Sequence, residues 1–180
     1  MKTESILWLL PVVFMIHDFE EIVMMKPWAA RNAGGLQRRF PRLASRLVPA
    51  IGRLSTGGFA VAVAEEFLLL SALTLLAVDY NLLALWTGLL LAFFVHLLVH
   101  VGQFLVFRRY VPVIFTSLPA AVYCVVAARE LTARGLVDWG TAVLWGIGCL
   151  ALVGLNLFLA LQLGARFDSW ASRWQASSGD

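Results

Sequence analysis

The sequence predicts an all-α integral membrane protein, and three observations lead to that fold class. The 180 residues are 61% hydrophobic and only 14% charged, with a mean hydropathy of +0.82, which is too apolar for a soluble domain of this length. Apolar runs long enough for helices that cross a membrane recur along the chain. The basic residues lie mostly between these runs. We therefore expect one bundle of about five transmembrane helices with interfacial amphipathic segments, and no separate soluble domain.

Five spans are expected, at about residues 5–25, 59–78, 82–107, 111–128 and 139–163. The first contains Pro11, which removes a helical hydrogen bond and kinks the chain. The second ends at the polar turn Asp79-Tyr80-Asn81, and the third ends at Arg108 and Arg109. In the fifth, Ala142, Gly146 and Gly154 are small enough for close contact between helices. Each span has the length needed to cross a hydrocarbon core.

Two polar segments are predicted to lie at the membrane surface. Residues 26–58 form a loop with seven Lys and Arg and no acid, and its apolar and basic residues recur at helical spacing, as in helices that lie on anionic membranes. Pro41 indicates that a helix there is short or kinked. The tail, residues 164–180, carries an apolar stripe that includes Phe167, Trp170 and Trp174. The loop serves either as a topology anchor or as a cover over a site in the membrane.

The basic residues also predict the orientation of the chain. With five spans, the loop, the Arg108-Arg109 turn and the tail share one side, which holds eleven of the fourteen Lys and Arg. The positive-inside rule then places the C-terminus in the cytoplasm and the N-terminus outside.

Polar residues inside the spans define the candidate site. Asp18, Glu20 and Glu21 interrupt the first span, although a charge at the centre of a bilayer costs about 2.5–3.5 kcal/mol on insertion scales. On a helix we expect His17, Glu20 and Glu21 to share a face, while Asp18 and Phe19 turn away.

Similar depths relate these residues to polar residues in the other spans. A layer roughly 10–15 Å below the cytoplasmic surface contains Glu65, Glu66, His96, His100, Gln103 and Asn156. His96 and His100 are four residues apart and so share a face of their helix. The candidate metal ligands are His17, Glu20, Glu21, Glu65, Glu66, His96 and His100, with Gln103 and Asn156 in supporting positions. Of the neighbouring pair, Glu66 is favoured over Glu65 as a ligand. Asn156 alone would also be explained by packing between helices.

The charge balance of this group indicates a cation. No Lys or Arg lies at this depth, so either several carboxylates are protonated or a cation sits among them. Imidazole with carboxylate suits zinc, iron or manganese, whereas calcium and magnesium sites are usually all-oxygen. We expect a transition metal ion, zinc or iron, with one or two ions per chain.

The motifs carry a family resemblance. His17-x-x-Glu20-Glu21 in the first apolar segment resembles the signature of the HXXEE family of small bacterial integral membrane proteins, which has no assigned activity. A family feature of the form Asn-Ala-x-x-His is similar to residues 96–100, where the final His is kept and His and Leu replace Asn and Ala. A Tyr-x-Pro-Gly feature resembles residues 110–113, without the glycine. The resemblance implies a shared site in the bacterial cytoplasmic membrane and no particular reaction.

Three functions remain open from the sequence. The first is a metalloenzyme that acts on a lipid or another hydrophobic small molecule near the cytoplasmic leaflet, by hydrolysis or oxidation, with Glu20 or Glu65 as general base. The second is a small cation or proton carrier, and the third is a structural metal clamp. The eight-histidine pattern of membrane hydroxylases and desaturases is missing, which argues against that chemistry. Membrane lipids and a hydrophobic substrate are the expected partners, and no nucleic acid.

Overall fold

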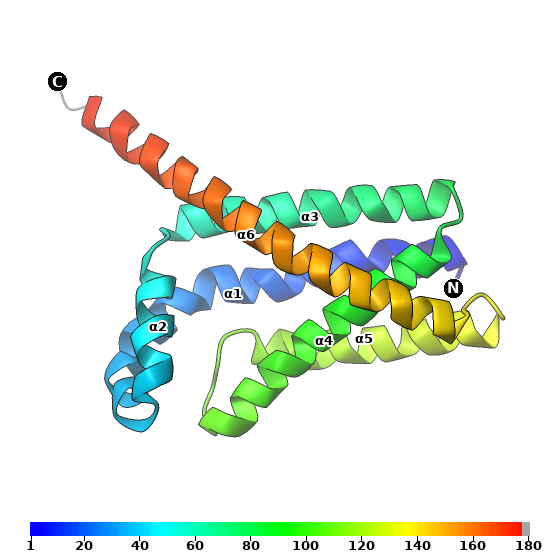
Figure 1. The fold of residues 1–180 in the computed structure, drawn as a ribbon, viewed down its shortest axis with the longest axis horizontal. Coiled ribbons are helices and arrows are strands. Elements are labelled where there is room, and N and C mark those ends of the chain that lie inside the picture. The colour runs from blue at the N-terminus through cyan, green and yellow to red at the C-terminus, as the bar shows by residue number, and fades with distance from the viewer. Residues whose placement is uncertain (178–180) are drawn as a thin grey trace.

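The computed structural model describes residues 1–177, and every regular element in that range is an α-helix (Figure 1). The six helices are α1 (Thr3–Arg39), α2 (Pro41–Gly52), α3 (Thr56–Asp79), α4 (Leu83–Phe107), α5 (Ile114–Ala133) and α6 (Trp139–Ser177). The predicted all-α bundle is therefore confirmed.

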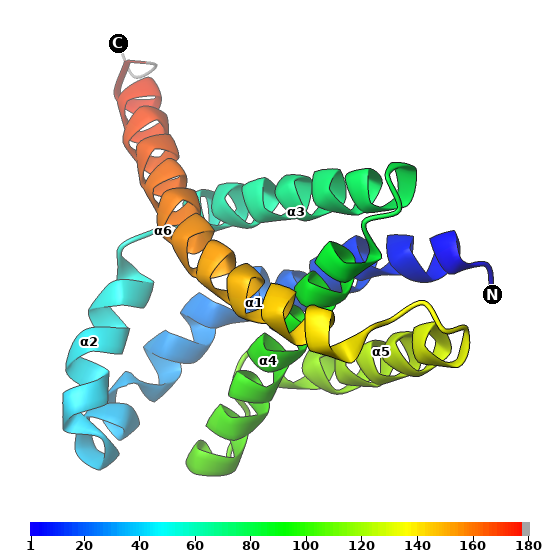
Figure 2. The same ribbon diagram turned by 45° about the vertical axis from the view of Figure 1, so that its right-hand side comes forward.

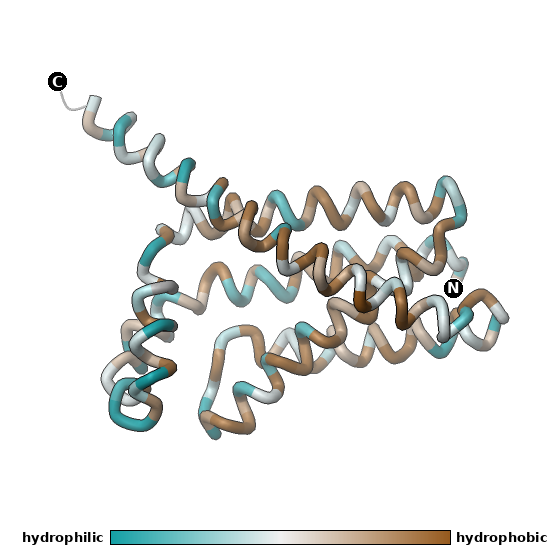
Figure 3. Tube along the Cα trace, in the orientation of Figure 1, coloured by the Kyte–Doolittle hydropathy of each residue, from teal (hydrophilic) through white to brown (hydrophobic). Residues whose placement is uncertain are grey.

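Helices α3, α4, α5 and α6 are each long and apolar enough to cross a membrane. Helix α1 is also long, at 37 residues, but its apolar part contains the acidic cluster around Glu20. Figure 3 shows apolar residues along most of the bundle and polar residues on α2 and the last turns of α6. Large apolar side chains on the outer faces are exposed, among them Leu68 (66%), Phe115 (72%) and Leu144 (71%). Surfaces of this kind are those that lipid tails cover, so the structure indicates a membrane protein.

Helix α1 is longer than the predicted first span. It continues beyond residue 25 through Pro27 and ends at Arg39, so part of the predicted loop 26–58 is helical. The break predicted at Pro41 is confirmed, because Phe40 leaves the helical conformation and α2 begins at Pro41. Proline disfavours helical geometry in the residue before it and is tolerated at the first position of a helix.

The predicted tail also continues as helix. Helix α6 runs for 39 residues to Ser177 and projects past the other helices (Figures 1 and 2); residues 178–180 lie outside the described residues. Gly164 lies within α6 and is used for packing. A Cβ atom at Gly164 would lie 3.1 Å from the carbonyl carbon of Gly58, at the start of α3, and closer still to its oxygen. The glycine therefore allows α3 and α6 to touch through their backbones.

A second glycine contact joins α4 and α6. A Cβ at Gly88 would lie 2.8 Å from the backbone and Cβ of Trp145, and one at Gly146 would lie 3.4 Å from Leu91. Ala142 and Gly146 are both buried, and the close contact predicted at Gly146 is confirmed by its distance to Leu91. The predicted contact at Gly154 is wrong, since a Cβ there would meet no atom within 4 Å.

Hydrogen bonds between helix ends define two ends of the bundle. The Arg39 guanidinium donates to the carbonyl oxygens of Val106 and Phe107 at 3.3 and 3.2 Å, which joins the C-terminal ends of α1 and α4. At the other end, Arg134 donates to Thr3 Oγ1 at 3.0 Å. The basic segments and the C-terminal part of α6 thus lie at one end and the N-terminus at the other (Figure 1). The side of the membrane that each end faces stays a prediction.

Candidate metal centre

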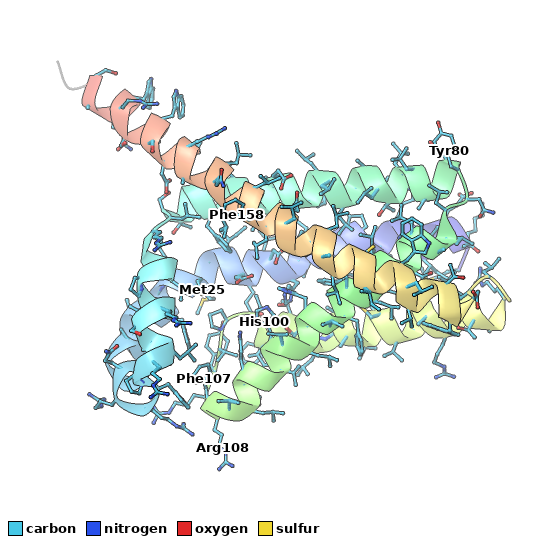
Figure 4. All side chains as sticks on the ribbon, in the orientation of Figure 1. Met25, Tyr80, His100, Phe107, Arg108 and Phe158 are labelled. Atoms are coloured by element: carbon cyan, nitrogen blue, oxygen red, sulfur yellow. The ribbon has the colours of Figure 1, made fainter. Side chains whose placement is uncertain are left out.

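Helices α1 and α4 bring together all three histidines of the chain. His17 Nε2 lies 3.3 Å from His96 Nε2, and His96 Nε2 lies 3.1 Å from His100 Nε2. His17 and His100 are both buried, and Figure 4 shows His100 farther from the C-terminal end of α4 than Phe107 and Arg108. In a tetrahedral zinc site with Zn–N of about 2.0–2.1 Å, the ligand nitrogens lie about 3.3 Å apart. The two distances from His96 Nε2 therefore match those between ligands of one ion, and the donor atoms of all three rings lie within 4.8 Å of one another.

Hydrogen bonds at the far side of two rings favour one tautomer of each, with the proton on Nδ1. His100 Nδ1 lies 3.2 Å from Gln103 Oε1, and an amide oxygen only accepts, so this Nδ1 carries the proton. His17 Nδ1 lies 3.4 Å from Thr116 Oγ1, whose own proton goes to Glu20 Oε2 at 2.7 Å. Both rings therefore direct the Nε2 lone pair at His96 Nε2, which has at most one proton to donate. A cation between them would satisfy all three nitrogens.

Glu20 lies outside the converging ring atoms and is held by α5 and the connection before it. Its carboxylate accepts from Tyr110 Oη at 2.8 Å, from the Thr116 backbone N–H at 2.9 Å and from the Thr116 hydroxyl. Thr116 lies in the first turn of α5, where backbone N–H groups lack helical partners and favour a negative charge. Burial, followed by the hydrogen bond and the charge of Glu20, raises the pKa of Tyr110, so the phenol stays a donor. Glu20 thus orients His17 through Thr116.

A second group of ligand atoms adjoins the histidines. Asp18, Glu21 and His96 each offer a donor atom within 4.8 Å of the other two. Asp18 is 4% exposed, and its Oδ2 has no hydrogen-bond partner within residues 1–177. The expectation that Asp18 turns away was therefore wrong. Positions 18 and 21 are three apart and share a face, and position 17 lies between that face and the one that carries Glu20.

A cavity of about 210 Å³ lies beside this second group, between α1, α3, α4 and α6. Its polar lining residues are Asp18, Glu21, Glu66, His96 and Asn156, and the rest of its wall is apolar. The carboxylates of Asp18, Glu21 and Glu66 are close enough to interact electrostatically. Among the described residues that form its wall there is no Lys or Arg. The cavity therefore combines an apolar surface with uncompensated acidic groups.

The remaining predicted site residues occupy distinct positions around these groups. Glu66 faces the cavity, whereas Glu65 accepts a hydrogen bond from Asn156 Nδ2 at 3.0 Å and is not part of the cavity wall. Neither predicted general base, Glu20 or Glu65, lies with the clustered ligand atoms among the described residues. Besides Asp18, sequence reasoning missed Thr116, because a single threonine in an apolar run gives no signal of its own.

Comparison with known families agrees with the motif. The family model described as "Protein of unknown function with HXXEE motif" matches residues 8–128, and the chain belongs to this family. The matched region includes His17, Glu20, Glu21, His96 and His100. No curated protein and no solved structure matches the chain.

Proposed function

We propose that this HXXEE protein is a membrane metalloprotein whose centre is formed by His17, His96 and His100. The observation that carries the proposal is that His17 Nε2 and His100 Nε2 both lie at tetrahedral ligand spacing from His96 Nε2, and that both present lone pairs. Without a cation, at least one close nitrogen–nitrogen contact lacks a proton. Imidazole ligands suit zinc or iron.

The neighbouring carboxylates adjoin the centre through His96. Asp18 and Glu21 lie within ligand distance of His96, in a group separate from the one that the three histidines form, and the pair offsets the charge of a divalent ion beside it. A second ion at Asp18, Glu21 and His96 is the other arrangement that this donor set allows. The ratio of metal to protein separates one ion from two.

The cavity supports a finer proposal, an enzyme that acts on a hydrophobic small molecule or one chain of a lipid. At about 210 Å³ it is smaller than the cavities of roughly 300–1,000 Å³ that hold drug-sized ligands, so it suits a slim alkyl chain. A bound metal ion would supply a Lewis acid. Glu66, on α3 across from the ligands, would then accept the proton of a water molecule that the ion activates, since Glu20 is occupied by three hydrogen bonds.

Two other functions explain the cavity less well. A carrier needs a polar path to both sides of the membrane, whereas the residues around the carboxylates, such as Phe14, Leu73 and Leu89, are apolar. A structural clamp explains the histidines that join α1 to α4, but it leaves the acidic cavity without a role.

Metal analysis of the purified full-length protein tests the proposal. After preparation without chelators, the wild type should carry at least one zinc or iron ion per chain, and His96→Ala and His100→Ala should carry almost none. Asn156→Ala is the matched control, because Asn156 lies beside the cavity but outside both ligand groups, and it should keep the metal. Full metal content in both histidine variants would refute the centre. A metal-free wild type that keeps its folded helical structure in detergent would exclude the clamp, even though bound metal adds stability by mass action.

A further inference from the structure

We propose that a second cavity, separate from the metal centre, binds the phosphate headgroup of an anionic membrane lipid. This cavity, here called the arginine pocket, has a volume of about 400 Å³ and lies where the C-terminal ends of α1 and α4 meet. Its lining residues are Trp28, Asn32, Gly35, Leu36, Arg38, Arg39, Phe40, Phe107, Arg109 and Tyr110. The inference does not depend on the metal centre.

The charge of the arginine pocket selects an anion. Arg38, Arg39 and Arg109 line it, and no acidic residue does so among the described residues. The two bonds from Arg39 to carbonyl oxygens of α4 hold its planar group without neutralising it. The salt bridge found within residues 1–177 joins Arg134 to Glu130, at the other end of the bundle. Guanidinium groups pair with phosphate through parallel N–H···O bonds, so phosphate fits better than a neutral headgroup.

The walls of the arginine pocket are built before a ligand arrives. Trp28 Nε1 donates a hydrogen bond to the Tyr110 carbonyl oxygen at 2.7 Å. The Phe107 ring packs edge-on against the rings of Trp28 and Phe40, with ring centroids 6.1 and 5.4 Å apart. Such aromatic residues concentrate at the level of lipid headgroups. The combination of fixed apolar walls with arginines suits an amphiphile, which brings a phosphate and a hydrocarbon part together. Free phosphate would use only the arginines.

Gly35 keeps one wall of the arginine pocket open. It lines the cavity, and a Cβ added there would meet no atom within 4 Å. A larger residue at this position would therefore occupy the cavity without changing the charge. Because any residue other than proline is a better helix former than glycine, the substitution should not weaken α1. Gly35→Leu thus separates the shape of the pocket from its charge.

Lipid binding to the full-length protein in detergent tests the proposal, measured by native mass spectrometry with dihexanoyl phosphatidylglycerol as the probe. We expect saturable binding, at least about tenfold weaker in Arg38→Gln/Arg109→Gln and in Gly35→Leu. The matched control is Arg31→Gln/Arg42→Gln, which removes the same charge from exposed positions outside the pocket and should bind within about twofold of wild type.

Several results would overturn the proposal. Equal losses in the two double variants would mean diffuse attraction of the basic segment rather than a site. Wild-type affinity in Gly35→Leu would mean that the lipid binds elsewhere. Equal affinity for dihexanoyl phosphatidylcholine would remove the selection for an anion. Inorganic phosphate that competes at the same concentration as the lipid would assign the pocket to free phosphate instead.

Discussion

Replacing Asp18 by leucine should stabilise the metal-free protein and reduce the stability that the protein gains from metal. The side chain is 4% exposed, and its Oδ2 has no hydrogen-bond partner within residues 1–177. A buried polar atom without a partner costs about 1–3 kcal/mol, and more when charged. Leucine removes this cost, and the adjoining cavity of about 210 Å³ leaves room for its branched end. The metal-free variant should therefore be more stable than the wild type by about 1–3 kcal/mol.

Bound metal should offset that advantage. In the wild type, metal at 100 times its dissociation constant adds about 2.7 kcal/mol of stability, and loss of a carboxylate near the ion reduces this gain. Thermal unfolding in detergent, with chelator and with added zinc, measures both differences. At roughly 2–4 °C per kcal/mol for a chain of this size, the metal-free variant should melt about 2–12 °C higher.

A control variant separates the buried carboxylate from surface charge. Asp79 lies exposed at the end of α3, so Asp79→Leu should change stability by no more than about 0.5 kcal/mol in either condition. If Asp18→Leu were less stable than the wild type even with chelator present, Asp18 would have a structural role and the reasoning would fail.

Three further predictions concern support of the centre, helix packing and orientation. Gln103→Leu should weaken metal binding about 10–100-fold in a chelator competition, because it removes the hydrogen-bond partner of His100 Nδ1. Gln162→Leu, at an exposed position of α6, is the control. Equal metal affinities in the two variants would contradict the role of Gln103. Gly88→Ala should destabilise the fold by about 1–3 kcal/mol through overpacking, whereas Gly154→Ala should not, as thermal unfolding would report; a tolerated Gly88→Ala would disprove the close contact of α4 and α6. A reporter fused to the C-terminus should be cytoplasmic and one fused to the N-terminus periplasmic, and both ends on one side would exclude five spans.

The fold could be predicted because each helix is defined by local signals. Apolar runs located α3 and α4 to within a few residues, and Pro41 located the break between α1 and α2. The ends of α1 and α6 could not be located in this way. Their polar extensions, residues 26–39 and 164–177, have helical sequences that hydropathy alone interprets as surface segments.

The histidines could be grouped from the sequence, but the acids could not be assigned. His96 and His100 share a face through their spacing, and depth relates them to His17. The choice between neighbouring acids depends on the rotation of a helix against its partners, which the spacing does not determine. That rotation turns Asp18 toward His96. It also directs Glu20 away from the clustered ligand atoms and toward the first turn of α5, where Thr116 donates two hydrogen bonds to its carboxylate.

X-ray absorption spectroscopy of the purified wild-type protein is the most direct test of the metal centre. The account predicts a zinc or iron edge whose nearest shell contains three imidazole nitrogens, at about 2.0–2.1 Å for zinc, with oxygen from a carboxylate. A protein free of first-row metals, or a shell of oxygen ligands without imidazole, would contradict the centre formed by His17, His96 and His100.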